Sequence, residues 1–124
     1  CGVGPGLGRS TAIAMARQGA HVVLGSRTES RINGYVRDIE ELGGKALAVP
    51  IDITKSGDPE RIASAAMGKF GKIDILVNNA ASGVMRSPSE LDPKHWDWTL
   101  DINARAPWLC AKAASAHMKG PLRS

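Results

Sequence analysis

Apolar positions follow two different periods along the first 77 residues of the chain. Stretches with apolar residues three or four positions apart predict helices, and the short, almost entirely apolar runs between them predict strands. The predicted order is helix 9–18, strand 21–26, helix 29–42, strand 46–51, helix 58–70 and strand 73–77. Helices that alternate with strands are typical of an α/β domain with a parallel sheet.

Turn and cap residues mark the ends of these elements. Gly19 follows the first helical stretch and favours the left-handed conformation that ends a helix. Asp58 and Pro59 offer the third helix a cap and a first-turn proline. Residues 73–77 are apolar except for one acidic residue, which predicts a strand buried on both faces. The chain is therefore expected to form part of a doubly wound parallel sheet.

One further helix is predicted from Pro93 to about Met118, with Trp96 and Leu100 among its apolar positions. Pro107 lies inside this stretch and is a candidate for a kink. No repeat, low-complexity tract or linker divides the chain. Residues 1–124 are therefore interpreted as one domain.

The composition restricts the classes of ligand and location. Sixteen Lys and Arg against twelve Asp and Glu give a net charge of +4, spread along the chain, which suits a small anionic ligand at least as well as nucleic acid. No apolar run approaches the roughly 18 residues of a membrane span, so we expect a cytoplasmic protein without a membrane partner. The two cysteines and three histidines are scattered, which argues against a metal site.

The segment before the first helix is rich in glycine. Gly2, Gly6 and Gly8 have the spacing G-x-x-x-G-x-G. Glycines allow positive φ and close backbone approach, and the N-terminus of the helix that follows directs unpaired N–H groups toward a phosphate. A flexible glycine-rich turn without a ligand is the alternative.

Ser26 ends the first predicted strand and Arg27 follows it, at the place where an NAD-binding domain carries an acidic residue for the ribose. Arg27 instead offers a planar guanidinium, which suits a 2′-phosphate in charge and geometry. This favours NADP over NAD as the cofactor. The alternative is an exposed arginine at the entrance of a helix.

Three further motifs follow the glycine-rich loop and Arg27 along the chain, in the order Asp52-Ile53, Asn78–Ala81 and Asn103. With this ordered set, the chain resembles the short-chain dehydrogenase/reductase family over nearly its whole length. The resemblance implies an NAD(P)-binding Rossmann-type domain of an oxidoreductase that interconverts a carbonyl and an alcohol. It also implies a small-molecule substrate, and a homo-oligomer when the protein is full length.

The resemblance further implies individual roles. The implied cofactor contacts are Gly2, Gly6, Leu7 and Gly8 at the pyrophosphate, Ser26 and Arg27 at the 2′-phosphate, Asp52 and Ile53 at the adenine, and Asn79, Ala80 and Ala81 beside the adenosine ribose. Asn103 matches the Asn of the family's catalytic tetrad, where it supports a water in the proton relay. The alternatives are that Asp52 only forms a turn, that Asn78 and Asn79 only bond a loop backbone, and that Asn103 faces water.

The Ser, Tyr and Lys of that tetrad have no counterpart in these residues. The one tyrosine, Tyr35, is followed four positions later by Ile39 instead of a lysine. Without the acid/base group, hydride transfer lacks its proton partner, so residues 1–124 alone are expected to be inactive.

The family's first strand would precede Gly2 and lie between the strands predicted at 21–26 and 73–77. Its absence, like that of the C-terminal strands, would leave backbone edges unpaired. We therefore expect an internal fragment of a longer reductase that is at best marginally stable by itself.

Two other functions remain open from the sequence. The chain could be a non-catalytic dinucleotide sensor on the same fold, in which case the missing Tyr and Lys are genuine. It could also be a basic module that binds RNA, for which the charge of +4 is the only support.

Overall fold

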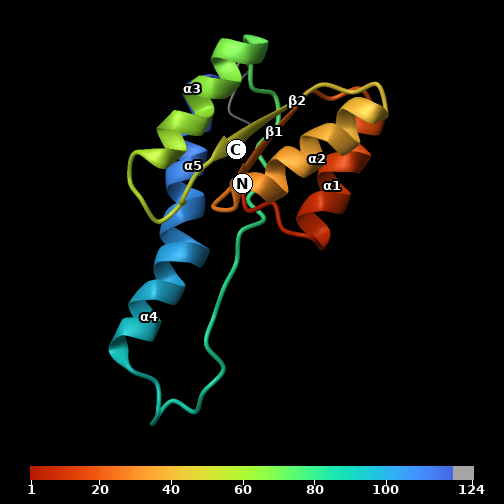
Figure 1. Ribbon diagram of the computed structural model, residues 1–124. Coiled ribbons are helices and arrows are strands. Elements are labelled where there is room, and N and C mark those ends of the chain that lie inside the picture. Colours follow the sequence, from red (N-terminus) through yellow and green to blue (C-terminus); the bar gives the residue numbers. More distant parts are fainter. Residues whose placement is uncertain (119–124) are drawn as a thin grey trace.

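Two parallel strands lie between two pairs of helices (Figure 1). The structure, a computed structural model, describes residues 1–118. The strands are β1 (Val22–Ser26) and β2 (Ala46–Pro50), which pair in register from Val22 with Ala46 to Ser26 with Pro50. The helices beside them are α1 (Leu7–Arg17), α2 (Glu29–Glu41), α3 (Asp58–Phe70) and α5 (Ala106–Ser115).

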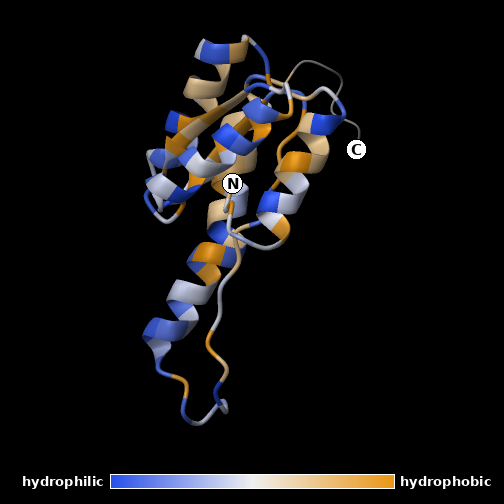
Figure 2. Cartoon of the chain, turned by 45° about the vertical axis from the view of Figure 1, so that its right-hand side comes forward, coloured by the Kyte–Doolittle hydropathy of each residue, from blue (hydrophilic) through white to orange (hydrophobic). Residues whose placement is uncertain are grey.

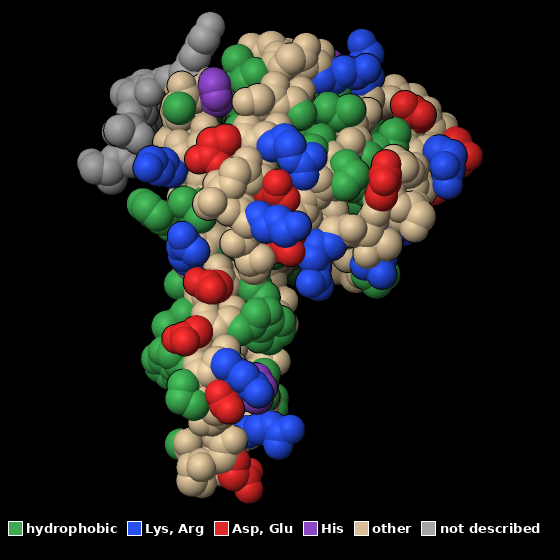
Figure 3. All heavy atoms as spheres, turned by 60° about the vertical axis from the view of Figure 1, so that its left-hand side comes forward, with side chains coloured by type: hydrophobic (Ala, Val, Ile, Leu, Met, Phe, Trp, Pro, Cys, Tyr) green, Lys and Arg blue, Asp and Glu red, His purple; other side chains and the backbone are tan. Residues whose placement is uncertain are grey.

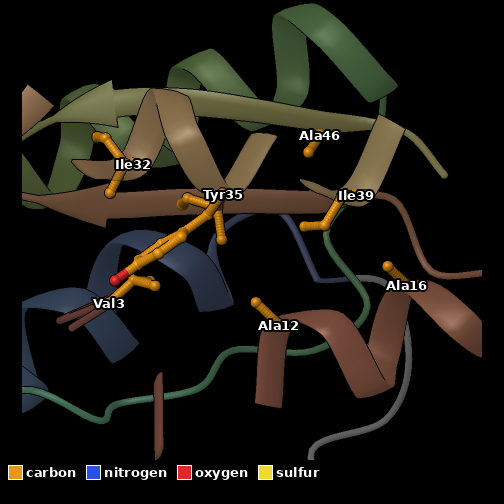
Figure 4. Close-up of a cluster of buried hydrophobic side chains, with 8 residues drawn as sticks. Val3, Ala12, Ala16, Ile32, Tyr35, Ile39 and Ala46 are labelled. Atoms are coloured by element: carbon orange, nitrogen blue, oxygen red, sulfur yellow. The ribbon is translucent and has the colours of Figure 1, made fainter. Parts of the chain in front are cut away.

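Side chains of the strands alternate between two hydrophobic cores, as successive residues of a strand must. Leu24 enters the core on the α1 and α2 side, in one cluster with Ile32 and Ile39 of α2. Figure 4 shows Ile32, Tyr35 and Ile39 of this cluster extending from α2. Val49 enters the other core, where it packs with Ile62 of α3. These helices and strands begin and end within two residues of the predicted positions.

Asp58 does not cap α3 in the way the sequence suggested. The N-cap residue is Gly57, whose φ of −87° and ψ of −13° are helical and not those of an extended cap residue. Asp58 therefore lies inside the helix and not at its N-cap, and its carboxylate accepts a hydrogen bond from the backbone N–H of Asp52 at 2.6 Å. Pro59 lies in the first turn, as expected.

Residues 73–77 do not form the predicted third strand. They are not paired with any strand within residues 1–118, where the sheet consists of β1 and β2. A strand requires a neighbouring backbone, and only the first two residues of the chain provide one here. Cys1 N donates to Val77 O at 2.9 Å, and Gly2 N donates to Gly25 O at 2.8 Å. The start of the chain thus lies between β1 and the segment near Val77, at the position expected for the end of the family's first strand.

A cavity of about 320 Å³ separates the rest of β1 from this segment. Its lining includes residues 22–24 of β1, residues 72–77, and Ile62 and Ala66 of α3. Ile75 is consequently 64% exposed, although its sequence environment predicts burial.

The predicted helix 93–118 is divided into three parts. These are α4 (Pro93–Leu100), a π-helical turn η1 (Asp101–Arg105) and α5, which ends at Ser115. Pro107 has no N–H to donate to the carbonyl four residues earlier, and a wider turn accommodates this loss. The irregularity therefore lies before Pro107, at Asn103, and not at the proline itself.

Helix α4 projects from the layers together with the extended segment that precedes it (Figure 1). None of its residues is buried, and Trp96 and Trp98 are exposed. Hydrophilic and hydrophobic positions are mixed along this projection (Figure 2), and hydrophobic side chains lie open on its surface (Figure 3). Within residues 1–118, no helix has the length and apolarity needed to cross a membrane.

Candidate functional site

The glycine-rich loop is held between β1 and the segment after Val77. Gly2 has a φ of +81°, and a Cβ at this position would lie 2.4 Å from the Cα of Ala80. Gly2 O also accepts a hydrogen bond from Nδ2 of Asn79 at 2.8 Å. Only glycine fits this conformation and this close contact, so Gly2 fixes the loop against Ala80.

The N-terminus of α1 follows this loop and presents free backbone donors. Its N-cap residue is Gly6, without a side-chain cap, and its first turn contains no acidic residue. Arg9 N and Ser10 N donate to backbone carbonyls of the loop, whereas the N–H groups of Leu7 and Gly8 have no hydrogen-bond partner within residues 1–118. Unpaired donors at the positive end of a helix form an anion-binding site.

Gly6 and Gly8 of the loop differ in the space around them. A Cβ at Gly6 would meet no atom within 4 Å, so the backbone there is open to a ligand. Gly8 is buried, and a Cβ there would lie 3.0 Å from both Asn79 Nδ2 and Val3 Cα. Gly8 therefore allows α1 to approach the rest of the site.

Polar residues follow both strands at the same edge of the sheet. Because Ser26 pairs with Pro50, Arg27 and Asp52 emerge at neighbouring strand ends. Arg27 is exposed, and its positive charge contributes to lowering the pKa of Asp52. Ser26 is half-buried and its Oγ accepts from Thr28 N at 3.5 Å, while Ile53 packs against the core on the α3 side.

Asp52 forms a tight turn with Thr54. Its Oδ1 accepts hydrogen bonds from the N–H and the hydroxyl of Thr54, at 3.0 and 2.7 Å. The Thr54 hydroxyl is the main cause that lowers the pKa of Asp52, with smaller contributions from the Thr54 N–H, Arg27 and Lys55, against partial burial. Asp52 thus carries a negative charge at neutral pH, and its Oδ2 has no hydrogen-bond donor within residues 1–118.

The asparagines bond to backbone groups. Asn79 bonds to the loop through Gly2 O, which is the alternative that the sequence left open for it. Asn103 lies in η1 and is exposed, and its side chain bonds both the N–H of Ser82, at 3.1 Å, and the C=O of Ser82. Asn103 therefore joins the helix to the extended segment at Ser82.

The structure brings most of the predicted site residues together. The loop from Gly2 to Gly8 contacts Asn79 and Ala80 and begins beside the end of β1, near Ser26. Ala81 is exposed just beyond this contact, and Asn103 belongs to a separate element that reaches Ser82.

Two residues at this edge were not predicted as part of the site. Asp58 contacts the backbone of Asp52, and Arg61 pairs with Asp58. The sequence did contain a signal for this pair, because an acidic and a basic residue lie three positions apart at the start of a predicted helix.

A parallel α/β layer with a glycine-rich loop, an uncapped helix N-terminus and polar strand ends is the arrangement of dinucleotide-binding domains. Residues 1–123 match the family model described as short chain dehydrogenase. The chain belongs to the short-chain dehydrogenase family.

Individual relatives agree with this assignment. The chain is 38% identical over 117 residues to the short-chain dehydrogenase/reductase FrzI of a Cladobotryum species, covering 94% of this chain and 45% of the relative. A Serratia marcescens short-chain dehydrogenase/reductase variant matches with a TM-score of 0.91 and 28% identity, over 95% of this chain and 49% of the other. A metagenomic short-chain oxidoreductase in complex with NADP matches with a TM-score of 0.83 and 30% identity, over 89% and 50%. The chain spans about half the length of the relatives it matches.

Proposed function

We propose that the chain is the cofactor-binding part of an oxidoreductase that uses NADP(H) to interconvert a carbonyl and an alcohol in a small-molecule substrate. The observation that carries the proposal is the pair of unpartnered N–H groups, on Leu7 and Gly8, at the open N-terminus of α1 within residues 1–118. A pyrophosphate is the anion that such a terminus accepts in a domain of this fold.

Each part of the cofactor has a proposed set of contacts. The proposed contacts are Gly2, Gly6, Leu7 and Gly8 for the pyrophosphate, Ser26 and Arg27 for the 2′-phosphate, Asp52 and Ile53 for the adenine, and Asn79, Ala80 and Ala81 for the adenosine ribose. Bound NADP(H) supplies or accepts the hydride. Within this chain, Asn103 is proposed to support the proton relay, while the acid/base group itself comes from outside these residues.

The preference for NADP over NAD rests on Arg27. Its guanidinium is exposed at the end of β1, where it is available to a phosphate. A charge-assisted pair of hydrogen bonds from arginine matches a phosphate well. The metagenomic relative in complex with NADP supports the same choice.

Binding to a full-length chain that carries this segment tests the proposal. Arg27→Ala should weaken NADPH by about 1.5 to 3 kcal/mol, the usual contribution of a hydrogen bond to a charged group, and leave NADH nearly unchanged. Titration calorimetry with both cofactors gives the measurement. Arg37→Ala, an exposed arginine near the far end of α2, is the matched control. An unchanged NADPH preference in Arg27→Ala contradicts the 2′-phosphate assignment.

The competing functions separate in the same protein. A dinucleotide sensor would bind NADPH, but it would have no downstream Tyr-x-x-x-Lys and would not turn over a substrate. An RNA-binding module would bind RNA, and NADPH would not displace that RNA. The proposal also includes a cytoplasmic enzyme that associates with copies of itself when full length.

A further inference from the structure

The turn that carries Asp52 is anchored from the start of α3. Asp58 Oδ2 accepts a hydrogen bond from the backbone N–H of Asp52 at 2.6 Å. The other carboxylate oxygen, Oδ1, accepts from Nε of Arg61 at 3.3 Å. Arg61 also donates from its terminal nitrogen to the backbone C=O of Pro50, the last residue of β2. The Asp58–Arg61 pair therefore holds the backbone on both sides of Ile51.

This use of Asp58 differs from that of a typical acidic residue at the start of a helix. Asp92, for comparison, caps α4 by accepting a hydrogen bond from Lys94 N at 2.9 Å. In α3 no side chain caps the first turn, and the Asp58 carboxylate reaches six residues back along the chain. Hydrogen bonds to an ionised carboxylate are about twice as strong as those between neutral groups. Asp58 is mostly shielded from solvent, with 18% of its side chain exposed, so solvent competes little for this contact.

The anchored turn sets the direction of the Asp52 carboxylate. Its Oδ1 is held by the N–H and hydroxyl of Thr54, which leaves Oδ2 as the acceptor without a donor within residues 1–118. The backbone N–H of Asp52 is fixed by Asp58. A shift of this backbone would move Oδ2 away from any group that it recognises.

We propose that Asp58 and Arg61 are positioning residues for the adenine end of the cofactor, acting through Asp52. The inference rests on the proposed function, and it assigns to the Asp58–Arg61 pair a role in affinity for the adenosine half alone. The nicotinamide half binds away from this turn and does not depend on the pair.

The test compares three probes on a full-length chain that carries residues 1–124. NADPH contains both halves, 2′,5′-ADP contains the adenosine half, and reduced nicotinamide mononucleotide contains the other half. Asp58→Ala should weaken NADPH and 2′,5′-ADP about tenfold, equal to about 1.4 kcal/mol, and change the mononucleotide by less than about twofold. Asp58→Asn keeps an acceptor for Asp52 N and should weaken the first two probes less than Asp58→Ala does.

Arg61→Lys keeps the charge but offers one nitrogen in place of the guanidinium that reaches both Asp58 and Pro50. It should give an effect on 2′,5′-ADP smaller than that of Asp58→Ala, and it provides the measurement if Asp58→Ala does not fold. Glu60→Gln is the matched control, because Glu60 lies in the same first turn, is exposed, and makes no hydrogen bond or ion pair through its side chain within residues 1–118.

Equal weakening of all three probes by the Asp58 variants would mean a general structural role and overturn the inference. Unchanged affinity for 2′,5′-ADP in Asp58→Ala and Arg61→Lys would overturn it as well. These results differ from a failure of the proposed function, in which the unsubstituted protein itself does not bind NADPH.

Discussion

An apolar segment lies along each of the two edges of β1, but only one of these segments forms a strand that pairs with β1. On one edge, β1 pairs with β2 through five consecutive residues in parallel register. On the other edge, residues 73–77 are just as apolar but form no ladder with β1, and contact is limited to the start of the chain at Gly25. Leu24 is 1% exposed, whereas Ile75 is 64% exposed.

This difference shows what an apolar run does and does not determine. An apolar sequence makes burial favourable, but a strand also requires hydrogen-bond partners for its backbone. β2 provides these partners for β1 over the full length of the strand. On the other edge, residues 1–2 provide backbone hydrogen-bond partners only to Val77 and Asn79. A cavity occupies the rest of that edge.

The largest expected effect tests the contrast in burial directly. In residues 1–124, Leu24→Ala should lower the free energy of unfolding by about 2–5 kcal/mol, because it removes a fully buried side chain and leaves a cavity. Ile75→Ala should change it by less than about 0.5 kcal/mol, as for an exposed position. Urea denaturation followed by circular dichroism, with an osmolyte that stabilises the folded state, provides the measurement. Similar losses in the two variants would mean that residues 73–77 are packed as well as β1.

Gly2 joins the two edges, so its substitution tests whether their contact matters. Gly2→Ala places a Cβ against Ala80 at a φ of +81°, which costs about 1–2 kcal/mol for the left-handed backbone and about 1–3 kcal/mol for overpacking.

Gly68→Ala is the matched control for Gly2→Ala. Gly68 lies inside α3, where an added Cβ would meet no atom within 4 Å, so alanine should stabilise the helix by about 0.5–1 kcal/mol. Urea denaturation of both variants gives the comparison. A Gly2→Ala variant as stable as the parent would show that the loop does not depend on its contact with Ala80.

The same contrast explains which parts of the fold were predictable. Local signals located α1, α2, α3, β1 and β2, because periodicity and glycine stops are properties of adjacent residues. Residues 73–77 carried an equally clear local signal, but their structure depends on a backbone elsewhere in the chain. The π-helical turn at Asn103 depended on the missing N–H of Pro107, which predicted an irregularity without its exact place.

The arrangement of residues at the candidate site was predictable to a similar extent. The spacing of Gly2, Gly6 and Gly8 indicated the loop at α1, and the strand ends indicated Arg27 and Asp52. The partner of Asn79 was not predictable, because its bond to Gly2 O joins residues 77 positions apart. Asp58 was interpreted as a helix cap. The sequence does not reveal that Gly57 occupies the N-cap position, or that the Asp58 carboxylate bonds the N–H of Asp52.

The smallest expected effect concerns Asp52, in the turn that follows β2 on the paired edge of β1. Thr54→Val removes the hydroxyl that is the main cause of the lowered pKa of Asp52, so this pKa should rise toward its ordinary value of 3.8. Because the folded-state pKa lies below the unfolded value, the Asp52 carboxylate stabilises the protein above about pH 4, and this contribution is lost as the pH falls through the folded-state pKa. Lys55→Gln removes the weakest of the contributing charges and should raise the pKa less. Carboxyl NMR titration measures both variants, and a larger rise in Lys55→Gln would show that charge, and not the Thr54 hydrogen bond, holds Asp52 ionised.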